Sequence, residues 1–199
     1  MGPNNFTNAG QVILVNCKDS LISNLNVSYS SLGISLYYCN NITISGNTAN
    51  NNDDGIFLYL SNNNSLSGNT AYNNDYGIIL HSSNNNTISG NTANNNDYGI
   101  RLRWSDNNDI LGNTANSNSW YGIYLDESNE NTIAGNTLLG NVKCIREKNC
   151  QGNEFSDNGE CIYGEIPIEL VILISVISGG AVIGVATLLL IRRKRKRMV

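Results

Sequence analysis

The sequence is poor in the side chains from which most metal sites and disulfide frameworks are built. It contains a single histidine, His81, and its two methionines stand at positions 1 and 198. The five cysteines are an odd number and include no CxxC pair, so neither a zinc site nor a closed set of disulfides is indicated. Metal sites that depend on imidazole ligands have almost no material here.

Positive charge is also scarce, except at one end. The formal net charge is −4, and residues 192–197 read RRKRKR. Removing those six positive charges leaves about −10 on the rest of the chain. An acidic body of this kind argues against nucleic acid as a partner.

Windows that could form an amphipathic helix are absent from the first 160 positions, because Gly and Asn interrupt each of them. What the sequence has instead is a repeat. Asn47, Asn69 and Asn91 lie 22 residues apart, and Gly55, Gly77 and Gly99 follow the same spacing. Trp120 is predicted to be the one-residue insertion that lengthens one repeat. Agreement over many columns indicates a solenoid.

Each repeat offers short strands such as TISGN and GIRLRW, in which apolar and polar residues alternate. A leucine-rich repeat also fits a period of 22, but the segment TANNND lacks the leucines and the helical return of that architecture. The prediction is an all-β, right-handed parallel β-helix of three short strands per coil, with about 22 residues per coil and six to seven coils. It spans residues 12–163, after a lead-in at 1–11.

The repeated columns become vertical stacks in such a fold, about 4.8 Å apart. Aliphatic columns, such as the one containing Ile56, Ile78 and Ile100, form the core. A stacked Asn can donate its amide hydrogen to the carbonyl of its neighbour, so the repeated Asn are predicted to be structural. The predicted ladder residues are Asn47, Asn69, Asn91, Asn113, Asn136, Asn64, Asn86, Asn108 and Asn131.

Cys17 and Cys39 fall in one column of small residues and should be stacked neighbours. Their spacing would permit a disulfide, but parallel side chains in register fit the geometry of that bond poorly. Free thiols that fill space are the favoured interpretation.

A long apolar run follows the repeats. After a linker at 164–169, residues 170–191 carry no charge and are long enough for a transmembrane helix. The basic tail at 192–199 places that end in the cytoplasm and the β-helix outside the cell. Gly180 and Gly184 form a GxxxG, either a weak helix contact or simply the glycine common in such helices. Because no signal sequence is recognised near Met1, we expect this chain to be the carboxy-terminal part of something longer; a tail anchor is the alternative.

The GIxLxx strands carry varied residues at outward positions. Aromatic rings with Arg and carboxylates suit a sugar-binding groove, whereas the other interpretation is a solvated face on which Arg103 pairs with Asp126. The candidate ligand-binding residues are Tyr59, His81, Arg101, Arg103, Trp104, Tyr124 and Asp126.

Asp53, Asp75 and Asp97 form another column. Stacked carboxylates repel, so they either splay into solvent, hold a proton or share a cation such as Ca²⁺. Ca²⁺ is the one cofactor that the sequence suggests, with solvated turn residues as the alternative.

Catalytic residues are not apparent. A glycosidase needs two carboxylates across a groove, but Asp126 and Glu127 are adjacent in a strand and point to opposite sides.

The string NNNTISGNTANNNDYGIRLRWS, at 84–105, resembles the repeat of the right-handed β-helix proteins called NosD-like. The resemblance covers about residues 12–163 and implies the fold more strongly than any function. The family is associated with a periplasmic accessory protein for copper-site maturation, and related coils bind or hydrolyse carbohydrate. The combination of coil, single span and basic tail resembles archaeal cell-surface proteins.

Three functions remain open at this stage. The first is a membrane-anchored, non-catalytic surface module that contacts polysaccharide or other envelope components. The second is a carbohydrate-active enzyme, lyase or hydrolase, whose catalytic coils are missing or unrecognised. The third is a NosD-type copper accessory protein.

Overall fold

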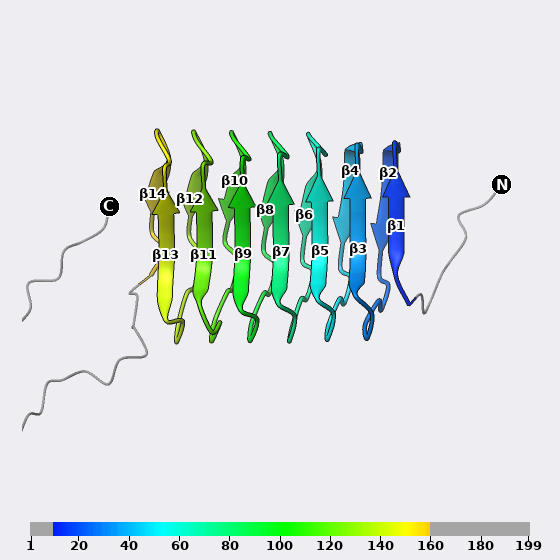
Figure 1. The fold of residues 1–199 in the computed structure, drawn as a ribbon, viewed down its shortest axis with the longest axis horizontal. Helices are drawn as coiled ribbons and strands as arrows, with labels where there is room; N and C mark the ends of the chain where they lie inside the picture. The colour runs from blue at the N-terminus through cyan, green and yellow to red at the C-terminus, as the bar shows by residue number, and fades with distance from the viewer. Residues whose placement is uncertain (1–9, 160–199) are drawn as a thin grey trace, which may run out of the picture. The chain divides into compact units, whose positions relative to one another are not determined.

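Residues 10–159 of the computed structural model can be described, and they form a parallel β-helix of about seven coils (Figure 1). The chain makes one strand of each of two parallel sheets in every coil. The front sheet contains β1 (Val12–Val15), β3 (Leu32–Tyr37), β5 (Asp54–Tyr59), β7 (Tyr76–His81), β9 (Tyr98–Arg103), β11 (Tyr121–Asp126) and β13 (Lys143–Lys148), in that order.

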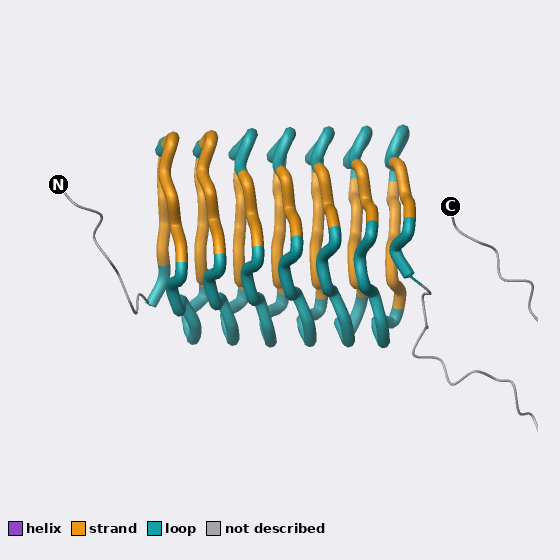
Figure 2. The backbone as a smooth tube through the Cα atoms, turned by 180° about the vertical axis from the view of Figure 1, so that it is seen from behind, coloured by secondary structure: helices purple, strands orange, loops and turns teal. Residues whose placement is uncertain are grey.

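The back sheet lies behind the front sheet in Figure 1 and is the nearer one in Figure 2. It contains β2 (Lys18–Ser23), β4 (Asn40–Ser45), β6 (Ser65–Ser67), β8 (Thr87–Ser89), β10 (Asp109–Leu111), β12 (Thr132–Ala134) and β14 (Glu154–Ser156). A third strand per coil was expected, but that side is reduced to single-residue bridges such as Thr70 to Thr92 and Thr92 to Thr114. On that side, backbone N–H groups flanking the bridges donate to the buried Asn side chains of the next coil. Those N–H groups are therefore not available for strand pairing between backbones.

Residues one period apart are paired neighbours. Ile56 pairs with Ile78, and Ile78 pairs with Ile100, and the same register holds along both sheets. The side chains of these columns are fully buried between the sheets. Burial of a whole aliphatic side chain stabilises the fold by about 1.5–3 kcal/mol, so the stacked columns supply most of the driving force.

The Asn side chains form continuous hydrogen-bonded ladders between coils. Asn91 Nδ2 donates to Asn113 Oδ1 at 3.0 Å and to the Leu66 carbonyl at 3.0 Å. The carbonyl of the Asn91 side chain accepts the backbone and side-chain N–H groups of Asn69, each at 2.9 Å. A third ladder, which the repeat pattern did not predict, runs through Asn52, Asn74, Asn96, Asn118 and Asn141.

Two columns of glycine serve different purposes. Gly90 has a φ of +62° and turns the chain at the end of β8, with open space where a Cβ would lie. Gly99 has no such backbone requirement. A Cβ there would lie 2.6 Å from the Gly122 carbonyl oxygen and 2.7 Å from Asn118 Nδ2, so the coils could not approach. Gly99 lies at the start of β9, as the predicted strand GIRLRW has it.

Cys17 and Cys39 lie in adjacent coils as free thiols, and the Cys17 amide donates to Cys39 Sγ at 3.3 Å. Within residues 10–159 no helix is long and apolar enough to cross a membrane. The predicted span at 170–191, its GxxxG, the linker and the basic tail lie outside the described residues.

Candidate functional site

The outward positions of the front sheet carry an array of aromatic and charged side chains, which we call the aromatic face. Alternation along each strand sends Ile100 and Leu102 inward and therefore Arg101 and Arg103 outward. Parallel register then repeats those outward positions from coil to coil. The columns of the aromatic face are Asp54, Tyr76, Tyr98, Tyr121 and Lys143; Phe57, Ile79, Arg101, Tyr124 and Arg146; and Tyr37, Tyr59, His81, Arg103, Asp126 and Lys148.

One group of rings gathers where the strands end, and we call it the first aromatic cluster: Tyr37, Tyr38, Phe57, Tyr59, His81 and Trp104. The ring centres of Tyr59 and His81 are 5.2 Å apart, and those of His81 and Trp104 are 5.0 Å apart. Burial and then the neighbouring Arg103 charge lower the pKa of His81, so this ring is neutral at pH 7. Three predicted residues from three successive coils therefore form one continuous row.

Trp104 has an unusual backbone conformation for a large residue, with φ at +49°. The left-handed region costs a non-glycine residue roughly 1–2 kcal/mol. This geometry turns the indole outward at the end of β9, where it is 41% exposed. The indole Nε1 donates to Glu127 Oε2 at 3.0 Å, and the Arg103 guanidinium carbon lies 4.0 Å from the ring centre. Trp104 is thus held in a fixed orientation by neighbours on two coils.

A second group of rings lies at the other end of the same strands. This second aromatic cluster consists of Tyr76, Tyr98, Trp120, Tyr121 and Tyr124. The rings of Tyr76 and Tyr98 are stacked 5.0 Å apart, and the guanidinium carbon of Arg101 lies 5.3 Å from each ring centre. Arg101 also donates one hydrogen bond to the Tyr76 hydroxyl at 3.0 Å.

The tyrosines at 76, 98 and 121 were missed as site residues in the sequence. Their signal was present, because a Tyr precedes the repeated Gly in three successive coils, but the strand was expected to begin after them. Burial raises the pKa of Tyr98 and of Tyr124 above that of a free phenol. Both hydroxyls therefore keep their protons at neutral pH and can donate hydrogen bonds.

Asp54 lies beside this cluster, at the outward position below Tyr76. Burial, followed by the negative charges of Asp53 and Asp75, raises its pKa to about 6, although the positive charge of Arg101 acts in the opposite direction. A carboxyl group with this pKa exchanges its proton near neutral pH, as an acid–base residue does.

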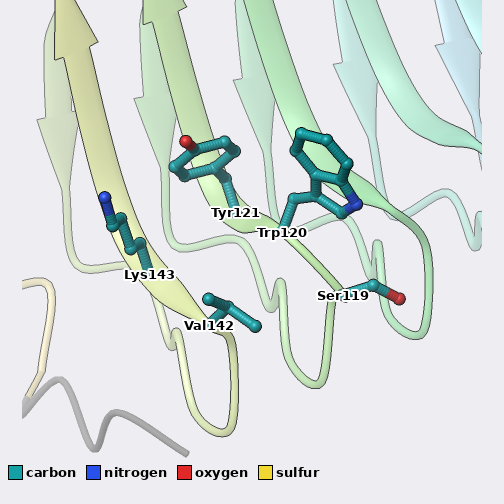
Figure 3. A pocket seen from close by; sticks show the side chains of 5 residues that line it. All are labelled: Ser119, Trp120, Tyr121, Val142 and Lys143. Carbon is teal, nitrogen blue, oxygen red and sulfur yellow. The ribbon is translucent and has the colours of Figure 1, made fainter.

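The extra residue of the long repeat creates a small hollow next to the second cluster (Figure 3). Up to Asn118 the register is 22 residues, but Tyr121 pairs with Tyr98 at 23. Trp120 continues the Asp97 column, and its amide donates to the Asp97 carbonyl at 3.0 Å. The extra residue is therefore Ser119, and the prediction that Trp120 is the insertion is wrong. The hollow has a volume of about 240 Å³ and is lined by Ser119, Trp120, Tyr121, Val142 and Lys143.

Asp126 does not pair with Arg103, although the two residues are register neighbours. Its Oδ1 atom lies 3.1 Å from Lys148 Nζ in the next coil. This oxygen receives no well-oriented hydrogen bond, so the charge attraction of Lys148 is its compensation. The interpretation of Arg103 and Asp126 as an ion pair is therefore wrong, and the reason is that Arg103 stacks on Trp104 instead.

The acidic column suggested as a Ca²⁺ site lies in the turns before β5, β7 and β9. Asp53 and Asp75 are exposed and Asp97 is half-buried. Among residues 10–159, no three His, Cys, Asp or Glu side chains are grouped closely enough to hold a metal ion, and this column is no exception. Exposure of Asp53 and Asp75 lets solvent screen the repulsion between the stacked charges.

The fold and its outward array define a parallel β-helix protein with an aromatic outer face. The chain matches the family model "Periplasmic copper-binding protein (NosD)" over residues 2–166 and belongs to this family. A comparison with curated proteins gave no significant match.

Solved structures with the same fold include two polysaccharide epimerases. The periplasmic alginate epimerase AlgG is 22% identical with a TM-score of 0.60, over 72% of this chain and 42% of AlgG. The A-module of the Azotobacter vinelandii mannuronan C-5 epimerase AlgE6 is 15% identical with a TM-score of 0.53, over 76% of this chain and 58% of the module. The chain thus spans well under two thirds of either structure, and the likeness is one of fold.

The family description mentions copper binding, and proteins bind copper through imidazole, thiolate and thioether groups. In the described part of the chain the His and Cys side chains are His81, Cys17, Cys39, Cys144 and Cys150, of which Cys144 is disulfide-bonded, and no three of them come together as a group that could hold a metal ion. Cys39 is buried in the core, whereas His81 belongs to the aromatic face. These residues do not fit a copper site.

Proposed function

We propose that this protein is a glycan-binding surface module, a β-helix held outside the cell membrane by the apolar segment at 170–191. The observation that carries the proposal is the row of rings through Tyr59, His81 and Trp104, which crosses three coils. Aromatic rings stack on the apolar faces of sugars, and a row of rings at coil spacing offers one platform after another along a chain of sugars.

The rings are positioned before any ligand arrives. Trp104 is held by Glu127, His81 and Arg103, and Tyr59 is held by Tyr38 and Phe57. Side chains that are already ordered lose little conformational freedom on binding, so more of the contact energy remains as affinity. Trp104 and Tyr38 are nevertheless 41% and 52% exposed, so part of each ring remains accessible, although Arg103 covers one face of the indole.

The location outside the cell is supported by the uncharged run at 170–191 and the six basic residues directly after it. A test is limited proteolysis of intact cells. Protease added outside should remove the β-helix epitopes and spare an epitope tag placed after position 199. Protection of the β-helix in intact cells would contradict the proposed orientation.

Binding is tested with the full chain in detergent micelles and a panel of immobilised polysaccharides. Trp104→Ala and Tyr59→Ala should each weaken binding about tenfold, because each removes one stacking platform. Tyr29→Ala is the matched control, since Tyr29 is 83% exposed and lies outside the aromatic face. If the control and the two face variants behave alike, the aromatic face is not the site.

A second candidate function is carbohydrate modification by proton transfer. The raised pKa of Asp54, among tyrosine hydroxyls and beside Arg101, is the observation that favours it. Incubation with polysaccharide should then yield an altered product, detected as a new ultraviolet absorbance or as changed sugar signals in an NMR spectrum. Asp54→Asn should abolish that product and leave binding intact.

A further inference from the structure

Basic residues are concentrated on the aromatic face of an otherwise acidic solenoid. Residues 10–159 contain 13 Asp and Glu but only six Lys and Arg. Five of the six basic residues occupy outward positions of the front sheet, and the sixth, Lys18, lies on β2 of the back sheet. The five are Arg101, Arg103, Lys143, Arg146 and Lys148.

The five basic residues lie in register on two strands, β9 and β13, with β11 between them. β9 presents Arg101 and Arg103, and β13 presents the other three two coils further on. Between them β11 contributes Tyr121 and Tyr124, which pair with Lys143 and Arg146. Because neighbouring strands are about 4.8 Å apart, the two basic rows are separated by roughly 10 Å, and this span holds the two tyrosines together with Asp126, whose carboxylate pairs with Lys148.

The two arginines of β9 are ordered but have almost no polar partners. Arg101 donates one hydrogen bond, to the Tyr76 hydroxyl, and Arg103 donates none within residues 10–159. Stacked rings hold both guanidinium groups in place. In the described part of the chain, the one ion pair between side chains joins Lys148 to Asp126, so neither arginine is neutralised by a carboxylate. An ordered, unneutralised guanidinium is suited to bidentate binding of an anionic group.

The hollow beside the second aromatic cluster lies at the β13 end of this surface (Figure 3). Its lining includes Trp120, whose indole is 54% exposed, and Lys143, one of the five basic residues. The Lys143 amine points along β13, and the Tyr121 ring lies between it and the indole (Figure 3).

We propose that the ligand of the aromatic face is an acidic polysaccharide that runs along the solenoid axis across β9, β11 and β13. This inference rests on the proposed glycan-binding function and specifies its ligand. Acidic groups of the polysaccharide bind Arg101 and Arg103 on one coil and Lys143 and Arg146 two coils on. The intervening sugar rings stack on Tyr121 and Tyr124. A nucleic acid is disfavoured because the solenoid around the five basic residues is acidic.

The experiment measures binding of the full chain in detergent to four probes: polygalacturonate, dextran sulfate, neutral dextran and oligodeoxythymidine. Carboxylated and sulfated chains share the anionic chemistry, and the first two probes separate them. We expect binding to at least one acidic polysaccharide at least tenfold tighter than to neutral dextran, and weakened by added salt. The double variant Arg101→Gln with Arg103→Gln should lower that affinity about tenfold or more. Lys18→Gln, the matched control, should leave it unchanged.

A variant that fails to fold is recognised by its melting temperature. In that case Lys143→Gln with Arg146→Gln replaces it, because both side chains are exposed. Equal binding of neutral dextran and acidic chains would overturn the inference and leave the glycan-binding function standing. Binding of none of the polysaccharides would overturn both. Tighter binding of oligodeoxythymidine than of any polysaccharide would identify a nucleic acid as the ligand and overturn the inference.

Discussion

The guanidinium carbon of Arg103 lies 4.0 Å from the centre of the Trp104 ring, although the two residues are adjacent in the chain. Neighbours in a regular strand point to opposite faces. The contact forms because Trp104 has a φ of +49°, which ends β9 and turns the indole back over the preceding side chain. A residue in an unfavourable backbone conformation thereby builds the pair of ring and cation on the aromatic face.

The first prediction concerns this pair. Arg103→Lys keeps the charge but loses the planar group that stacks on the indole and binds an anion through two parallel hydrogen bonds. We expect affinity for an acidic polysaccharide to fall about three- to tenfold, measured by titration calorimetry. If the lysine variant matches the original protein, charge alone matters and the stacked geometry does not.

The second prediction concerns the Asn ladders. Asn91→Leu removes the partner of both Asn69 N–H groups and leaves the Leu66 carbonyl without its donor. Unsatisfied buried polar groups cost about 1–3 kcal/mol each, so the free energy of unfolding should fall by at least about 3 kcal/mol. Asn94→Ala, which loses one hydrogen bond from the Asn116 amide, should cost about 1 kcal/mol. Urea unfolding measures the free energy of unfolding of both variants. Equal losses of that free energy would count against a special role of the ladder.

The third prediction separates the two glycine columns. Gly99→Ala places a Cβ 2.6 Å from a backbone oxygen and should destabilise the fold by about 3 kcal/mol through overpacking. Gly90→Ala meets no atom and should cost about 1 kcal/mol, from its left-handed backbone alone. Gly90→Asn should be tolerated better than Gly90→Ala, because Asn accepts that conformation. Thermal unfolding ranks the three variants, and the reverse order for Gly99 and Gly90 would refute the steric explanation.

The fourth prediction concerns pH. The pKa of Asp54 is about 6 in the folded chain, above its ordinary value of 3.8, so the folded state binds this proton more tightly than the unfolded state does. The contribution of Asp54 to stability is therefore fully present below about pH 4 and is lost as pH rises toward 6 and beyond.

Asp54→Asn should accordingly stabilise the protein at pH 7.5 and give no gain at pH 4. The full shift corresponds to about 3 kcal/mol, but partial exposure and screening reduce the expected gain to about 1 kcal/mol. Denaturant unfolding at the two pH values measures it. Asp75→Asn is the comparison, since Asp75 is exposed and should change stability less. A gain for Asp54→Asn that is the same at both pH values would contradict the assignment.

Much of the fold followed from spacing alone. A period of 22 placed Ile78 beside Ile56 and Ile100, and the structure pairs them in that order. The third Asn ladder was harder to find, because Asn74 and Asn96 stand in runs of Asn where no single column is distinct. The third strand of each coil was overestimated, since periodicity does not reveal whether a stacked segment pairs over several residues or at one.

The aromatic face was only half predictable. The columns through Tyr59 and Arg101 follow from alternation in a strand, which is a local property. The contribution of Tyr98 depended on where β9 begins, and the boundary of a strand is set by hydrogen bonds to the neighbouring coils. Likewise, Asp126 had Arg103 on one side and Lys148 on the other, and sequence spacing could not choose between them.

By itself, the sequence determined the repeat, the parallel register and the residues that face the core, because a solenoid coil contacts only the coils beside it and a fixed period specifies those contacts. The tertiary structure decided which outward side chains meet. The left-handed backbone of Trp104 recurs one period away at Ser82 and at Glu127, so it belongs to the repeat, but the packing of the Arg103 guanidinium on the indole does not follow from that period. The hollow beside Trp120 lies at the extra residue before Tyr121, which is a local departure from the repeat.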